Sequence, residues 1–238
     1  MQTAQEKLAQ AKTRLAEKLF QAGCIVMAPP GDGFTLVLHR KQGQPNWPLS
    51  PVYFDFRTWD YDPVKPGPVT EDLLWDITAC FREMIAQDKI VFDRIVGIPR
   101  AGDAFAKALS QTYDLPPVIL RKESIGENLF RVVSGLPPRE SRLLAVENFV
   151  TTAHSILRAG CALFFDDYFP PDAITDALVV GEWGTGAKER LRDIAFPINL
   201  HALFTVSELM QIGQDAGYVT ASFAWRVAEF ASFLRGKI

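Results

Sequence analysis

Residues 143–155 (LLAVENFVTTAHS) carry acidic, amide and hydroxyl side chains directly after a short apolar run. Glu147 and Asn148 follow that run, and Thr151 and Thr152 come just before a pattern with helical spacing. This order predicts a strand, a loop and a helix. In a parallel α/β sheet, ligands collect at such a turn because it opens at the carboxyl end of a strand. Unpaired N–H groups at the helix start would then face a bound anion, so the sequence predicts a phosphate-type site.

The remaining elements must supply the sheet that positions this turn. Apolar runs predict strands at residues 94–98, 117–120, 142–146, 174–181 and 199–204. Helices are predicted between them at about residues 103–109, 152–165 and 186–194. Two more helices follow, and a capping box at Thr205 and Glu208 opens the first of them. This alternation predicts an α/β fold with a parallel sheet flanked by helices. Residues 122–141 lack clean periodicity and predict a long loop, either a lid or a disordered segment.

The N-terminal part has a different pattern. Apolar residues recur at helical spacing and predict a helix over residues 4–22, which either packs on the domain surface or forms a dimer arm. Strands are predicted at residues 23–28, 34–39 and 50–57. Thr70 then caps a further helix.

Composition limits the possible function classes. The 238 residues are 48% apolar and 22% charged, which is typical of a globular enzyme with a full core. A net charge of −3 gives no reason to expect nucleic-acid binding. The three cysteines lack C-x-x-C spacing and predict free thiols in a reducing compartment. The N-terminus lacks the apolar core of a signal peptide, and no run approaches about 18 apolar residues. We therefore expect a cytoplasmic protein without a membrane partner.

Several segments, taken in order, resemble the type I phosphoribosyltransferases, and most specifically orotate phosphoribosyltransferase. The resemblance is carried by residues 50–57 (SPVYFDFR), 97–102 (GIPRAG), 120–123 (LRKE), 143–155 and 200–209 (LHALFTVSEL). It implies one domain, with a hood in residues 1–67, a five-stranded parallel core in residues 68–210 and a C-terminal helix in residues 211–238. It also implies a homodimer, and a reaction that joins a base to the ribose of phosphoribosyl pyrophosphate with loss of pyrophosphate.

The resemblance further implies roles for individual residues. Lys122 and Glu147 are the expected catalytic residues. Mg²⁺ is expected to accompany the donor, without dedicated protein ligands. Arg100 either supplies charge to the pyrophosphate or is a surface arginine at a helix start. The complete set of expected donor-binding residues is Arg100, Arg121, Asn148, Val150, Thr151, Thr152, Ala153, His154 and Ser155.

The donor-binding turn departs from the family pattern at three positions. Asn148 stands where the family has a second acid. Ala153 and His154 stand where it has small residues that let backbone amides approach a phosphate. The side chain of His154 would either bind the phosphate or plug the pocket.

The lid and the base site depart as well. The second lysine of the lid falls on Ile125, its aromatic position falls on Glu127, and the arginine that holds the orotate carboxylate falls on Trp183. Removing one electrostatic stabiliser of a transition state costs about 3–4 kcal/mol. If the losses of the lid lysine and of the base-binding arginine are each of this size, orotate turnover falls by at least about 10³-fold.

Two functional hypotheses follow. In the first, the protein transfers phosphoribosyl to orotate or a related base in pyrimidine nucleotide biosynthesis, with weak activity. In the second, it binds phosphoribosyl pyrophosphate or a nucleotide without catalysis and acts through a partner. If it binds neither ligand, a structural or interaction protein remains, and the amphipathic terminal helices would form its interaction surface.

Overall fold

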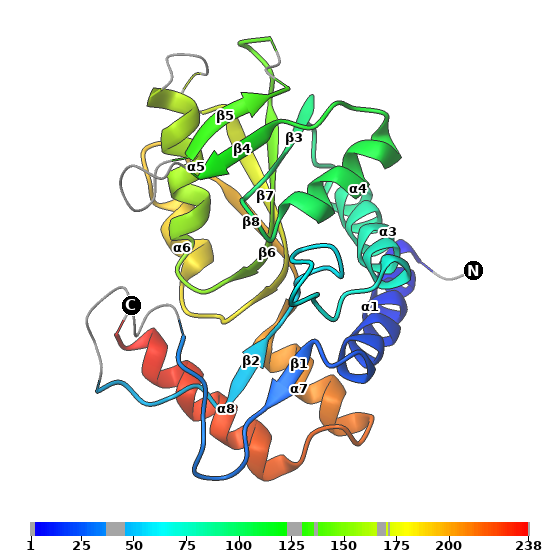
Figure 1. The fold of residues 1–238 in the computed structure, drawn as a ribbon, viewed down its shortest axis with the longest axis vertical. Coiled ribbons are helices and arrows are strands. Elements are labelled where there is room, and N and C mark those ends of the chain that lie inside the picture. The colour runs from blue at the N-terminus through cyan, green and yellow to red at the C-terminus, as the bar shows by residue number, and fades with distance from the viewer. Residues whose placement is uncertain are drawn as a thin grey trace.

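Four parallel strands form the central sheet, in the order β3-β6-β7-β8 (Figure 1). They are β3 (Arg94–Gly97), β6 (Leu143–Val150), β7 (Ile174–Glu182) and β8 (Asn199–Thr205). The computed structural model describes residues 3–36, 46–122, 130–135, 138–165, 170 and 172–237. The predicted parallel α/β class is confirmed.

The prediction that residues 117–120 form a fifth strand of this sheet is wrong for most of that segment. Only Val118 forms a parallel bridge, to Val96 of β3. The chain then continues as β4 (Ile119–Lys122), which pairs antiparallel with β5 (Phe130–Ser134). β5 falls within the predicted loop 122–141, because its half-exposed residues give only a weak apolar pattern.

β6 is longer than predicted, and this changes the setting of the acidic residues. Glu147 and Asn148 lie within the strand rather than in a loop after it. The cause is the nine-residue β7, which pairs with β6 as far as Val150 and Glu182. Helix α5 (His154–Phe165) then begins two residues later than predicted.

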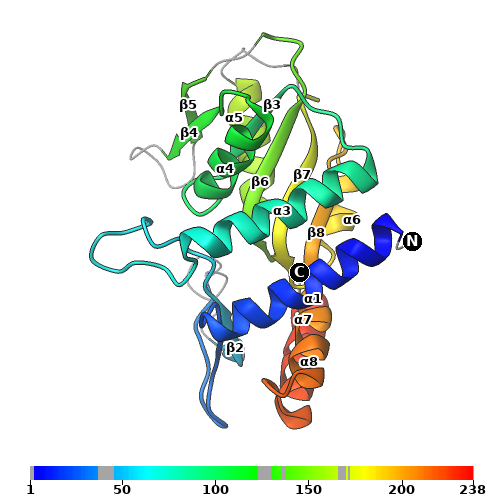
Figure 2. The same cartoon turned by 90° about the vertical axis from the view of Figure 1, so that its right-hand side faces the viewer.

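Helices cover both faces of the sheet (Figure 2). On one face, α3 (Glu71–Asp88) and α4 (Asp103–Tyr113) pack with strand residues that include Leu144 and Val146. On the other face, α5 and α6 (Ala187–Arg192) pack with Leu143 and Ala145. The side chain of Thr70 caps α3, as predicted.

The N-terminal helix α1 (Ala4–Gln21) lies beside α3, with Leu8, Leu15 and Leu19 buried (Figure 2). It is therefore packed on the body of the protein. The strands that follow are shorter than predicted: β1 (Ile25–Met27) pairs antiparallel with β2 (Val52–Phe54). Phe34 makes one bridge to Ser50, and residues 37–39 of the predicted second strand lie outside the described residues.

The C-terminal helices are confirmed. α7 (Val206–Asp215) begins at the predicted capping box of Thr205 and Glu208, and α8 (Ala221–Arg235) follows. Both lie beyond one end of the sheet, near β1 and β2 (Figure 1). Among the described residues, no helix combines the length and apolar character needed to cross a membrane.

Candidate functional site

The predicted site lies at the carboxyl end of β6, next to the β1–β2 pair. Phe149 of β6 stacks on Phe54 of β2, with ring centroids 4.5 Å apart. Glu147 and Asn148 precede this contact and the turn 151–153 follows it. The side chain of Val150 is buried in the core, and its carbonyl oxygen accepts the N–H of Trp183 at 3.1 Å. Most of the predicted site residues therefore lie close together because they belong to one continuous segment, residues 147–155.

Glu147 is the buried acid of this site, with 6% of its surface exposed. One carboxylate oxygen accepts the N–H of Asn148 at 3.2 Å. Burial raises the pKa of Glu147 to about 8, and the negative charge of Asp103 acts in the same direction. Hydrogen bonds from Asn148 and Ser155 oppose this rise in pKa. Without a ligand, Glu147 is therefore largely protonated at neutral pH.

Asn148 already uses one acceptor position of its side-chain oxygen. Its side-chain oxygen accepts the N–H of Phe149 at 2.6 Å. The second acidic position of the family pattern is thus occupied by a neutral group already bonded to the backbone.

The β7–α6 loop and helix α6 both donate hydrogen bonds to the turn between β6 and α5. The hydroxyl of Thr185 donates to the carbonyl oxygen of Thr151 at 2.6 Å. Arg190 donates to the carbonyl oxygens of Thr152 at 3.3 Å and Thr151 at 3.5 Å. Ala153 adopts a left-handed φ of 63°, a conformation in which a glycine is easier to place. Thr185 and Arg190 were missed from the sequence, because only tertiary structure brings them to this turn.

His154 lies at the start of α5 and its side chain is exposed. The ring nitrogen Nδ1 of His154 lies 3.0 Å from the hydroxyl oxygen of Thr152. Burial of the ring, followed by the charges of Arg158 and Arg190, lowers the pKa of His154. The imidazole is therefore neutral at pH 7, and it forms a hydrogen bond with the Thr152 hydroxyl in the turn after β6.

Arg100 and Arg121 lie near a second carboxylate, that of Asp103 at the start of α4. Burial raises the pKa of Asp103 to about 6, although part of the residue faces solvent, and both arginine charges oppose the rise. Arg100 also donates to the carbonyl oxygen of Tyr61 at 3.3 Å and lies 5.1 Å from its ring centroid. Arg100 therefore contacts Tyr61, in the predicted hood, and also acts electrostatically on Asp103.

Of the predicted loop 122–141, the structure describes strand β5 but not the residues that carry the lid pattern. The side chain of Lys122, at the end of β4, lies outside the described part of the chain, and so do Ile125 and Glu127.

Trp183 follows β7 and is 4% exposed. It packs edge-on against three aromatic rings, those of Phe54, Phe149 and Phe230. Its position is therefore apolar and enclosed. Arg235 of α8 donates to the carbonyl oxygen of Gly184, the next residue, at 3.1 Å. This arginine is a cation beside the loop where a base-binding arginine was expected.

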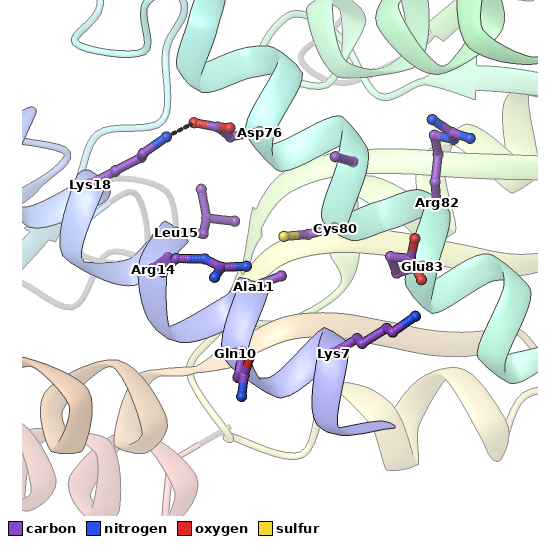
Figure 3. Close-up of a pocket in the computed structure, with 11 residues that line it drawn as sticks. Lys7, Gln10, Ala11, Arg14, Leu15, Lys18, Asp76, Cys80, Arg82 and Glu83 are labelled. Carbon is purple, nitrogen blue, oxygen red and sulfur yellow. Dashed lines mark hydrogen bonds and ion pairs between the residues drawn. The ribbon is translucent and has the colours of Figure 1, made fainter. Parts of the chain in front are cut away.

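A separate cavity of about 550 Å³ lies between α1 and α3 (Figure 3). Its lining mixes charges of both signs, from Lys7, Arg14, Lys18, Arg82, Asp76 and Glu83. Lys18 and Asp76 are paired at 2.6 Å. None of the predicted site residues lines this cavity.

Solved structures define the class of protein to which this fold and site belong. The orotate phosphoribosyltransferase of Aeropyrum pernix superposes with a TM-score of 0.63 and 24% identity, over 87% of this chain and 99% of that one. The UMP synthase of Leishmania donovani gives a TM-score of 0.70 at 20% identity, over 92% of this chain and 42% of that one. The chain thus has the phosphoribosyltransferase fold.

Proteins of similar sequence identify the family within this fold. The orotate phosphoribosyltransferase of Coxiella burnetii is 27% identical over 186 residues, which are 78% of this chain and 82% of that protein. That of Pyrococcus furiosus is 30% identical over 135 residues, 57% of this chain and 71% of that protein. No family model matches the chain. The chain belongs to the orotate phosphoribosyltransferase family, as an orotate phosphoribosyltransferase-like protein of pyrimidine biosynthesis.

Proposed function

We propose that this protein binds phosphoribosyl pyrophosphate at the end of β6 and slowly transfers its phosphoribosyl group to orotate or a related base. One observation carries the proposal: a buried acid, Glu147, lies near the end of β6, just before a hydroxyl-rich turn that leads into a helix. A solved relative, the Mycobacterium tuberculosis orotate phosphoribosyltransferase, was crystallised with this donor.

Each part of the site matches one part of the donor. The carboxylate of Glu147 accepts hydrogen bonds from the ribose hydroxyls, which favours its ionised form. Backbone N–H groups at the start of α5, with the hydroxyls of Thr151 and Ser155, bind the 5′-phosphate. Arg100 and Arg121, whose charges both act on Asp103, bind the pyrophosphate.

Mg²⁺ fits this donor set. The ion usually binds through one or two carboxylates together with substrate phosphates. Asp103 and Glu147 provide two carboxyl groups close enough to influence one another. The described residues hold no cluster of three or more typical metal ligands, and the donor's phosphates together with water would complete the coordination. When bound, Mg²⁺ neutralises charge that develops on the leaving pyrophosphate.

The enclosed Trp183 supports slow transfer. A buried aromatic ring offers no charge to a base carboxylate, and removal of such an interaction typically costs about 1.5–3 kcal/mol. The same observation favours the second candidate, a protein that binds the donor without catalysis.

Two measurements separate these functions. Calorimetry with phosphoribosyl pyrophosphate and Mg²⁺ should detect binding, and Glu147→Ala should weaken it at least about tenfold. Pyrophosphate release should then occur with orotate and not without a base. Binding without release from any base tested would establish the non-catalytic function. No binding at all would reject both.

We further propose that residues 1–238 form one domain that assembles as a homodimer in the cytoplasm. One apolar cluster runs from Leu8 of α1 to Leu234 of α8, which supports a single folding unit. The three cysteines are free, with Cys24 and Cys80 buried, which supports a reducing compartment.

A further inference from the structure

We infer that Asp103 is the second carboxylate of the donor site, and that it makes donor binding depend on Mg²⁺. This inference rests on the proposed function, because it assigns a positioning residue to that same site. In sequence, Asp103 is 44 residues before Glu147, so the strand motif gives no indication of it.

The backbone brings Asp103 to the end of the sheet. A methyl group added to Gly97 of β3 would lie 2.9 Å from Oδ1 of Asp103 and 2.8 Å from its Cα. Gly97 in turn pairs with Val146, the residue before Glu147. A methyl group on Gly102 would collide with the carbonyl oxygen of Val146. Two glycines thus allow the first residue of α4 to approach the carboxyl end of β6.

The need for a second carboxylate follows from Asn148. This residue is neutral, and its oxygen is already bonded to the N–H of Phe149. Glu147 is therefore the acid that β6 itself supplies at this point. Asp103 interacts electrostatically with Glu147 from the neighbouring strand end.

The surrounding charges determine what Asp103 does. It lies within the fields of Arg100 and Arg121, the two cations assigned to the pyrophosphate. A carboxylate in that position repels a bare pyrophosphate. With Mg²⁺ bound to the pyrophosphate, the same carboxylate attracts the complex. Asp103 thus opposes donor binding without the metal and favours it with the metal.

The test is the dissociation constant of phosphoribosyl pyrophosphate, measured by calorimetry with Mg²⁺ and with EDTA. For Asp103→Asn, we expect tighter binding in EDTA and weaker binding with Mg²⁺. The ratio of the two constants should fall about tenfold, within the usual range for coupled binding events.

Asp114→Asn is the matched control. Asp114 caps the opposite end of the same helix in a left-handed conformation, with φ 51°, that asparagine also tolerates. This variant should keep the wild-type ratio. Adding Asn148→Asp to Asp103→Asn should restore most of the Mg²⁺ dependence. Thermal unfolding of each variant verifies that it is folded.

The outcomes are distinct. If the wild type binds the donor and Asp103→Asn keeps the wild-type ratio, the role of Asp103 is rejected and the proposed function stands. If the wild type fails to bind the donor in either condition, the proposed function is rejected and the inference with it.

Discussion

At the scale of single residues, burial and hydrogen bonding determine what the candidate site can do. Glu147 is an acid whose burial favours the protonated form, and His154 is a base whose surroundings favour the neutral form. Both are therefore uncharged at neutral pH before a ligand arrives. Two single substitutions test these states.

Glu147→Gln should change the pH dependence of stability. The pKa of Glu147 is raised in the folded protein to about 8, above the ordinary value of about 4.3. Its contribution to stability is therefore fully present below pH 4.3 and is lost as pH rises through 8. Relative to the wild type, the unfolding free energy of the variant should rise by roughly 2–4 kcal/mol between pH 5 and pH 9. Urea denaturation at both pH values measures this difference, and a pH-independent difference would contradict the raised pKa.

His154→Ala should strengthen donor binding by about fivefold. The substitution frees the Thr152 hydroxyl from its 3.0 Å contact, and one hydrogen bond is worth about 1 kcal/mol. It removes no charge at pH 7, because the pKa of the imidazole is lowered. Calorimetry measures the change. In a Thr152→Val background the gain should vanish, whereas a loss of affinity in His154→Ala would mean that the imidazole itself binds the donor.

At the scale of elements, a histidine joins three pieces of the fold. Nδ1 of His201 on β8 lies 2.7 Å from Asp88 at the end of α3, and Nε2 lies 2.9 Å from Asp176 of β7. Only the protonated ring can donate from both nitrogens at once. Burial opposes this charge, but the hydrogen bonds of Asp176 and Asp88 outweigh it and raise the pKa of His201.

This contact predicts a second pH effect. Because the pKa is raised by folding, the stabilisation is fully present below about pH 6.5 and is lost as pH rises through the folded value. His201→Gln should cost about 1–2 kcal/mol of unfolding free energy at pH 5.5 and less at pH 8.5. The comparison is made between Glu147→Gln and the double variant Glu147→Gln/His201→Gln. This removes the contribution of Glu147 to the pH dependence of stability. An equal cost at the two pH values would exclude a charged imidazole.

At the scale of the whole molecule, one apolar core connects the N-terminal helix, the sheet and the C-terminal helices. Several large apolar side chains remain on the surface, including Trp75 and Trp225, which are 42% and 61% exposed. Light scattering should give a molar mass of twice 26.6 kDa if the proposed homodimer forms. A mass of 26.6 kDa at every concentration measured would exclude it.

Local signals in the sequence were sufficient for most elements. Threonine caps at Thr70 and Thr205 marked helix starts, and the spacing of Phe223, Val227, Phe230 and Leu234 marked the buried face of α8. Such signals are reliable because a cap or an apolar stripe depends on residues within a few positions of each other. The strand, the turn and the acid at 143–155 were predicted in the same way.

Tertiary structure decided the rest of the site, because pairing and burial depend on residues far apart in the chain. Glu147 lies in a strand because β7 continues beside it, and its pKa is raised because the folded protein buries its carboxyl group. Asp103 and Arg190 reach the same strand end from other segments. By itself, the sequence was sufficient to predict the family of the chain and the turn that follows β6. Only the fold decided which charges surround it.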